Sequence, residues 1–121
     1  MQKSVLIIDD EPQFVEIVEK RLSSLYKIFT AYDGRTGVRL ALEHKPDLVI
    51  IDILMPGVDG YEVLAELKKH SNELRKTAFV MLTAVGQTQS INKVLEMGAD
   101  DYFIKPFPLE ELVRMVKKLL N

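Results

Sequence analysis

Three aspartates in this chain come at the ends of apolar segments, where carboxylates can take part in chemistry. Asp9 and Asp10 directly follow an apolar run at residues 5–8, and Asp52 directly follows a second run at residues 48–51. If these runs are neighbouring strands, the carboxylates crowd together, and their repulsion raises at least one pKa unless a cation lies among them. Carboxylate oxygens suit Mg²⁺, which keeps several of its own waters when it binds. We therefore predict a magnesium site at these aspartates.

A hydroxyl and an ammonium group follow two further apolar segments. Thr83 follows residues 79–82, and Lys105 follows residues 102–104. A group with several negative oxygens would fit between the cation on one side and these two side chains on the other, and a phosphoryl group has that character. Phosphoryl transfer depends mainly on positioning and on neutralising charge, and a carboxylate can act as its nucleophile. Among the carboxylates, Asp52 is the best placed nucleophile.

The apolar segments that precede these groups have the composition of buried strands. Their residues do not alternate with polar ones, and short unbroken runs rich in branched residues are typical of strands covered on both faces. Three runs are clear and two are weaker. In chain order, the five predicted strands lie at residues 5–8, 28–31, 48–51, 79–82 and 102–104.

The segments after the strands have helical periodicity. Gly98 can close the fourth predicted helix as a C-terminal cap, and Pro108 suits the first turn of the fifth. The apolar positions of the five helices are Phe14, Ile17, Val18, Leu22 and Leu25; Leu40 and Leu42; Tyr61, Val63, Leu64 and Leu67; Ile91, Val94 and Leu95; and Leu109, Leu112, Val113, Val116 and Leu120.

The order strand–helix therefore occurs five times. This alternation predicts an α/β fold, a five-stranded parallel sheet with helices on both faces and right-handed crossovers. In such doubly wound sheets, ligands bind outside the carboxyl ends of the strands, at the point where the strand order reverses. The aspartates, Thr83 and Lys105 all come at that edge.

Composition limits the class of protein. The 121 residues suit one domain spanning residues 1–121, and 47% apolar with 28% charged residues is ordinary for a soluble globular domain. A net charge of −2 provides no basic surface for nucleic acid or anionic lipid. The absence of cysteine excludes thiol chemistry and disulfides. No segment reads as a signal peptide or a membrane span, so we expect a cytoplasmic domain without membrane contact.

Four sequence blocks together make the chain resemble the receiver domains of two-component response regulators, of the chemotaxis-receiver type. The resemblance runs from about residue 3 to residue 120, and the four blocks in order are a specific signature although each alone is weak. They are the acidic pair Asp9-Asp10, the run Asp52-Ile53-Leu54-Met55-Pro56-Gly57-Val58-Asp59-Gly60, the triplet Leu82-Thr83-Ala84, and Gly98-Ala99-Asp100-Asp101-Tyr102 leading into Lys105-Pro106-Phe107.

The resemblance implies a flavodoxin-like fold with strand order 2-1-3-4-5 and a set of roles at the acidic residues. Asp52 is expected to be the phosphoacceptor. Asp10 and Asp52 are expected to bind Mg²⁺ directly with the backbone carbonyl of Leu54, while Asp9 acts largely through water. Mn²⁺ is expected to substitute for Mg²⁺.

The resemblance also assigns roles at the two later strand ends. Lys105 is expected to pair with the phosphoryl oxygens, and Thr83 to move toward the phosphate and hydrogen-bond it. Tyr102 is expected to be the switch aromatic that rotates inward as Thr83 moves. The peptide bond between Lys105 and Pro106 is expected to be cis, which is chemically reasonable only before proline.

As a function, the resemblance implies a two-component signal transduction switch. A sensor histidine kinase or a histidine phosphotransfer protein would donate the phosphoryl group, and the surface of helix 4, strand 5 and helix 5 would change to control an output partner or effector domain. The domain would assist its own phosphorylation and dephosphorylation but turn over no separate substrate. The sequence does not identify the kinase, the signal, the output partner, the oligomeric state or whether the domain stands alone.

Three alternative readings are compatible with parts of the pattern. A flavin carrier shares the alternation but would need a phosphate loop where this chain has Asp9, Asp10 and Glu11. A phosphatase with an aspartyl nucleophile would carry Asp-x-Asp after the first strand, whereas the two aspartates here are adjacent. A degenerate receiver that serves only as a scaffold usually lacks one of the acidic, threonine or lysine positions, and all of them are present.

Overall fold

The computed structural model describes residues 2–84 and 88–121, which form one parallel sheet between two layers of helices. The order of the strands across the sheet, β2-β1-β3-β4-β5, confirms the order implied by the resemblance. The strands are β1 (Ser4–Ile8), β2 (Lys27–Ala31), β3 (Leu48–Asp52), β4 (Ala78–Ala84) and β5 (Asp101–Lys105).

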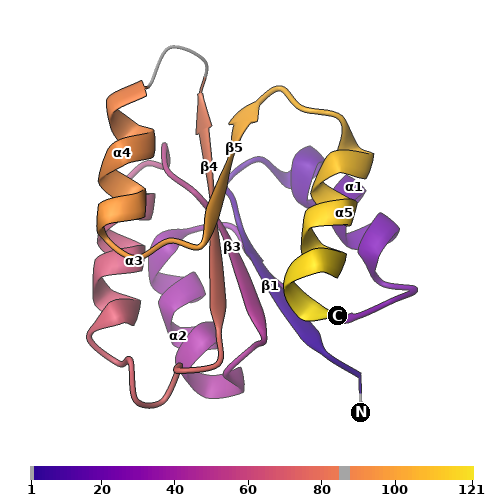
Figure 1. The fold of residues 1–121 in the computed structure, drawn as a ribbon, viewed down its shortest axis with the longest axis horizontal. Helices are drawn as coiled ribbons and strands as arrows, with labels where there is room; N and C mark the ends of the chain where they lie inside the picture. The colour runs from indigo at the N-terminus through magenta and orange to yellow at the C-terminus, as the bar shows by residue number, and fades with distance from the viewer. Residues whose placement is uncertain (1, 85–87) are drawn as a thin grey trace.

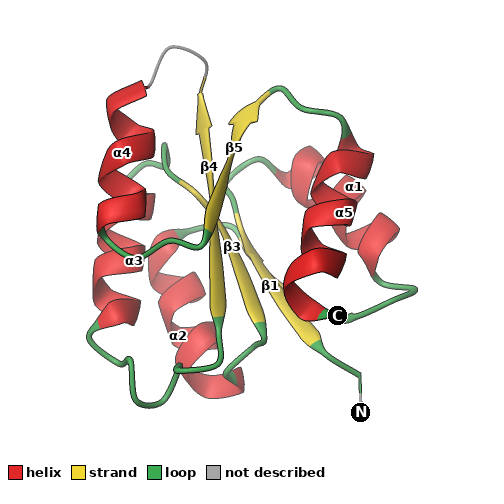
Figure 2. Ribbon diagram, viewed as in Figure 1, coloured by secondary structure: helices red, strands yellow, loops and turns green. Residues whose placement is uncertain are grey.

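The helices of the described residues are divided between the two faces of the sheet, as Figure 1 shows. One face is covered by α1 and α5, and the other by α2, α3 and α4 (Figure 2). This arrangement confirms the doubly wound fold. The helices are α1 (Pro12–Leu22), α2 (Gly34–His44), α3 (Gly60–Lys68), α4 (Thr88–Glu96) and α5 (Leu109–Leu120).

Side chains of the central strands point alternately into the two helical layers. On β3, Val49 and Ile51 pack in the core beneath α2, α3 and α4, whereas Leu48 and Ile50 pack in the core beneath α1 and α5. All five residues of β3 are buried. Because both faces are covered, the strand reads as an unbroken apolar run rather than an alternating one.

The apolar stripe of α1 differs from the predicted one. Ile17 is 57% exposed, and Leu25, which lies beyond the end of the helix, is 39% exposed. The buried stripe is instead Val15, Val18 and Leu22. These three residues are spaced by three and four positions and share one face of the helix, whereas Ile17 is turned away from that face.

Three strands extend further than the apolar runs predicted. Asp52, Thr83 and Lys105 do not follow their strands but belong to their last residues. The parallel ladder pairs Asp52 with Leu82 and Lys105 with Ala84. Backbone pairing therefore continues into the polar residues and fixes them on the rigid sheet rather than on loops.

A clamp at Asp100 joins the starts of β4 and β5. The N–H of Asp100 donates to the carbonyl of Phe79 at 2.8 Å, and the N–H of Phe79 donates to Oδ2 of Asp100 at 2.7 Å. The preceding Gly98 has φ 99, and the N–H groups of Gly98 and Ala99 donate to carbonyls of the last turn of α4 at 3.1 and 3.0 Å. This Schellman motif confirms the predicted cap at Gly98.

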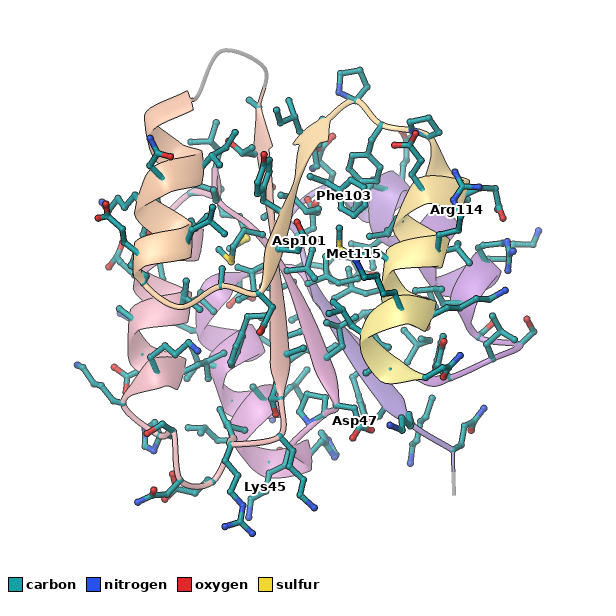
Figure 3. All side chains as sticks on the ribbon, viewed as in Figure 1. Lys45, Asp47, Asp101, Phe103, Arg114 and Met115 are labelled. Atoms are coloured by element: carbon teal, nitrogen blue, oxygen red, sulfur yellow. The ribbon has the colours of Figure 1, made fainter. Side chains whose placement is uncertain are left out.

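The strands begin at one edge of the sheet and end at the opposite one. Lys45 and Asp47 lie where the connection from α2 enters β3, at the bottom of the view in Figure 3, and the strands end at the opposite edge. Phe103 and Met115 fill the space between β5 and α5 in the same view and pack against the core there.

Within the described ranges, none of the helices has the length and apolar character needed to cross a bilayer.

Gly60 begins α3 in close contact with the end of β3. A Cβ at this position would lie 2.4 Å from the carbonyl oxygen of Asp52 and 2.6 Å from Cα of Ile53, and backbone atoms cannot move aside as the end of a side chain can. We expect Gly60→Ala to lower the free energy of unfolding by about 3 kcal/mol, measured by urea denaturation at equilibrium.

The matched control is Gly57→Ala. Gly57 has φ 75, and a Cβ there would have nothing within 4 Å, so only its backbone conformation is at stake. We expect this variant to cost about 1 kcal/mol. A cost at Gly60 no larger than the cost at Gly57 would show that the contact with β3 relaxes easily.

Candidate acidic site at the carboxyl ends of the strands

The end of β3 and the loop after β1 bring three carboxylates together. Each of Asp9, Asp10 and Asp52 has a carboxylate oxygen within 4.8 Å of an oxygen of the other two. The strands that carry these residues are neighbours, with Ile8 opposite Ile51 in the register. Sheet topology therefore produces the predicted cluster, at the edge where a doubly wound sheet binds ligands.

The three carboxylates differ in their exposure. Asp9 is completely buried, Asp52 is 6% exposed, and Asp10 is half-buried. Oδ1 of Asp9 accepts a hydrogen bond from the N–H of Glu11 at 3.0 Å. Buried carboxylates are costly unless they are paired or bind a cation, so the cluster needs positive charge.

Lys105 supplies one positive charge from the end of β5. Its Nζ donates to Oδ2 of Asp9 at 2.8 Å and to Oε1 of Glu11 at 2.9 Å. Oδ1 of Asp52 lies 3.8 Å from the same nitrogen, close enough for attraction but too far for a hydrogen bond. The ring of Phe14 covers another side of the ammonium, with 4.5 Å between Nζ and the ring centroid.

The balance of charge is visible in the pKa values. Burial and, to a smaller extent, repulsion by Asp9 raise the pKa of Asp52 to about 7, because the attraction of Lys105 only partly opposes them. Burial also raises the pKa of Asp9, although hydrogen bonds from Lys105 and Glu11 work in the other direction. For Lys105, burial lowers the pKa, but the hydrogen bonds to Asp9 and Glu11 and the attraction of the carboxylates together outweigh it, and the net change is upward.

One ammonium is therefore too little for this cluster. The donors available are carboxylate oxygens, which suit a hard divalent cation such as Mg²⁺ and do not suit a soft metal. The number of acidic groups, their proximity and the raised pKa of Asp52 all fit such a cation. The described residues thus form an acidic pocket of the kind that Mg²⁺ occupies.

Thr83 and Tyr102 lie on one face of the sheet, whereas Lys105, which pairs with Ala84, lies on the other. Thr83 is 2% exposed and follows Leu82, the partner of Asp52 in the ladder, by one residue. Tyr102 pairs with Met81 and packs, half-buried, against the core beneath α2, α3 and α4. Because residues two apart in a strand share a face, Thr83 points into the same layer as Met81.

Leu54 and Pro106 complete the predicted set. The side chain of Leu54 is 59% exposed. The peptide bond between Lys105 and Pro106 is cis. A pocket of about 380 Å³ opens beside the ammonium, lined by Glu11, Phe14, Lys105, Pro106 and Phe107.

Two neighbours of Lys105 were not anticipated from the sequence. Glu11 was expected only as part of the acidic stretch after the first strand, and Phe14 only as an apolar position of the first helix. Both contact the ammonium. The spacing Glu11–Phe14 of three residues at the start of a helix places both on one face, but nothing in the sequence points that face toward β5.

The chain is similar to a well-populated family of signalling domains. A model of the response regulator receiver domain matches residues 5–117. A protein of Guillardia theta named "Probable transcriptional regulator ycf27" is 42% identical over 121 residues, which are 99% of this chain and 46% of that protein. A protein of the same name from Cyanophora paradoxa is also 42% identical, over 99% of this chain and 49% of that one. The chain thus spans about half the length of these curated relatives.

Solved structures agree with this similarity. The chemotaxis protein CheY4 of Vibrio cholerae has a TM-score of 0.90 and 27% identity, with 99% of this chain and 100% of that chain covered. The BeF₃-activated receiver domain of DrrB, a protein from Thermotoga maritima, has a TM-score of 0.87 and 30% identity, with 99% and 98% covered.

The raised pKa of Asp52 predicts a stability that depends on pH. Between its ordinary value of 3.8 and about 7, the folded state holds a proton on Asp52 that the unfolded state has lost. The free energy of unfolding therefore falls as pH rises through this range. We expect Asp52→Asn in EDTA to flatten this dependence and to be more stable than the parent by about 1–3 kcal/mol above pH 7.

Urea denaturation of both proteins from pH 5 to pH 8 measures this difference. Equal slopes of stability against pH, or a less stable Asn variant at pH 8, would show that another group relieves the repulsion at Asp52.

Proposed function

The chain belongs to the response regulator receiver domain family, the phosphoacceptor domains of two-component signalling, and we propose that Asp52 is the residue that accepts the phosphoryl group. The observation that carries this proposal is the position of Asp52. It is a nearly buried carboxylate at the end of the central strand β3, with two further carboxylates and the Lys105 ammonium around it. We propose that residues 1–121 form a single receiver domain.

The acidic pocket is the proposed Mg²⁺ site. Asp10 and Asp52 are the proposed direct ligands, together with the backbone carbonyl of Leu54, and Asp9 acts through water. Mn²⁺ is a proposed substitute. A bound cation would supply the positive charge that the cluster lacks and would neutralise charge on the transferring group.

The reaction exchanges one bond to phosphorus for another. A carboxylate oxygen of Asp52 attacks phosphorus in line with the leaving group, a P–O bond forms, and the bond to the donor nitrogen breaks as the donor imidazole leaves. Lys105 and Thr83 are the proposed donors of hydrogen bonds to the phosphoryl oxygens. Attack by water on the product returns the free carboxylate and releases inorganic phosphate, so no separate substrate is turned over.

The proposed switch couples Thr83 to Tyr102. Phosphorylation adds roughly two negative charges at Asp52, and Thr83 gains a contact that exists only in that state. Both side chains face the layer that contains α4, so Tyr102 can move inward as Thr83 is drawn toward the phosphate. The surface of α4, β5 and α5 is the proposed output surface. An added group shifts such an equilibrium only through contacts that differ between the two states.

The proposed phosphodonor is a sensor histidine kinase or a histidine phosphotransfer protein in the cytoplasm, and the output partner is undefined. We propose that this domain itself does not bind nucleic acid, since its net charge is −2. The relatives named transcriptional regulators are about twice as long as this chain. The proposal therefore concerns only the part of those proteins that this chain matches.

Incubation with acetyl phosphate and Mg²⁺, followed by intact-mass spectrometry, tests the acceptor. We expect one phosphoryl adduct on the parent protein and none on Asp52→Asn or in EDTA, because both the nucleophile and the cation are needed. An adduct that persists in Asp52→Asn would place the acceptor at another residue. Failure of the parent to form an adduct, despite measurable Mg²⁺ binding, would favour a receiver used only as a scaffold or an acceptor that depends strictly on its kinase.

Thermal unfolding with and without Mg²⁺ tests the cation site independently of phosphorylation. At a concentration 100 times the dissociation constant, Mg²⁺ should stabilise the parent protein by about 2.7 kcal/mol. Asp10→Asn should require a much higher concentration for the same effect, because one carboxylate ligand is lost.

Glu43→Gln is the matched control, since it removes one negative charge at an exposed site on α2. The control should respond to Mg²⁺ as the parent does. If the two variants respond alike, the stabilisation reflects screening of the net charge and not binding at the acidic pocket.

A further inference from the structure

The ammonium of Lys105 is engaged away from Asp52. A lysine ammonium has three N–H donors, and two of them are used by Oδ2 of Asp9 at 2.8 Å and Oε1 of Glu11 at 2.9 Å. The separation from Oδ1 of Asp52 is 3.8 Å, longer than a hydrogen bond. A phosphoryl group on Asp52 would therefore meet a lysine that has two of its three donors bonded to other acceptors.

The two carboxylates that hold Lys105 are not equivalent. Asp9 is completely buried, and without Lys105 its charge would be uncompensated in the protein interior, which is costly. The side chain of Glu11 is 64% exposed, and water can replace Lys105 as its partner. Of the two bonds, the one to Glu11 is the easier to break.

The surroundings of Glu11 allow this release. Glu11 is the N-cap residue of α1, but its side chain makes no capping hydrogen bond. The start of the helix therefore does not depend on where this carboxylate points. On another side of the ammonium, the ring of Phe14 at 4.5 Å would still stabilise the positive charge after Glu11 has left.

We propose that Glu11 is a positioning residue that competes with the phosphoryl group for Lys105. In the unphosphorylated domain it holds the ammonium on the solvent side of Asp9. When a phosphoryl group is present, Glu11 turns to water and Lys105 donates to the phosphoryl oxygens instead. Breaking this ion pair is a fixed cost of activation, and removing the pair favours the activated state. This inference rests on the proposed role of Asp52.

Beryllofluoride in saturating Mg²⁺ is the probe, because this anion takes the place of a phosphoryl group on a carboxylate, and a BeF₃-activated receiver domain is among the structures similar to this one. Its dissociation constant can be measured by ¹⁹F NMR on the full chain. We expect Glu11→Gln to bind beryllofluoride about two- to fivefold more tightly than the parent, the range that an exposed ion pair provides.

Glu11→Asp separates the ion pair from the general effect of charge. This variant keeps the negative charge but has a side chain one carbon shorter, and aspartate at an N-cap position favours bonding to its own helix. If the contact with Lys105 is what matters, Glu11→Asp should bind the anion more tightly than the parent, as Glu11→Gln does. Both variants should retain the melting temperature of a folded domain in Mg²⁺.

The outcomes distinguish the two levels of the argument. If Glu11→Gln binds more tightly but Glu11→Asp equals the parent, only the net charge acts and the positioning role is wrong. If both variants equal the parent, Glu11 does not compete for Lys105. If the parent itself binds no beryllofluoride in Mg²⁺, the proposed role of Asp52 fails, and the inference fails with it.

Discussion

The repulsion among carboxylates at the end of β3 is the constraint on which the rest of the structure depends. Asp9 and Asp52 are buried within a few ångströms of each other, and a single ammonium is shared between them and Glu11. Such a cluster tends to expand or to take up protons. The chain keeps it in place by attaching the charged groups to the least deformable part of the fold. Asp52 ends a strand whose five residues are all buried, and Lys105 ends a strand paired with β4. The apolar core thus stabilises a fold in which the carboxylates at the site repel one another. Because this repulsion is relieved by positive charge, it favours the binding of a cation.

The fold could be predicted from the sequence because its strongest signals are local. Unbroken apolar runs at β1, β3 and β4 indicated strands covered on both faces, and the helical segments between them required a parallel arrangement. The order of the strands could not be predicted from such local signals, because five parallel strands can be arranged in many ways. The correct order came from the resemblance to receiver domains. Boundaries also failed in an instructive way. Polar residues such as Asp52 and Lys105 were predicted to follow their strands, yet backbone pairing includes both of them as the last residues of β3 and β5.

The site was predictable as a set of residues but not as a network. The clustering of Asp9, Asp10 and Asp52 follows from topology, because the carboxyl ends of adjacent parallel strands meet at one edge. The partners of Lys105 could not be predicted, because several acceptors lie within reach of its long side chain. Which of them it contacts depends on distances that sequence spacing does not determine. Glu11 and Phe14 reach it because the start of α1 lies beside the end of β5. Ile17 shows the same limit, since a residue can fit an apolar pattern and still face solvent.

The clamp at Asp100 has a mechanical consequence for the pair of strands that carry Thr83 and Lys105. Two reciprocal hydrogen bonds tie the first residues of β4 to the residue that precedes β5. These two bonds add to the ladder that pairs β4 with β5 as far as Thr83 and Lys105. The two strands are therefore held to each other at both ends, and a displacement of one carries the other with it. Two side chains that lie on different strands, Thr83 and Lys105, thus keep a common frame of reference when the charge at the acidic pocket changes.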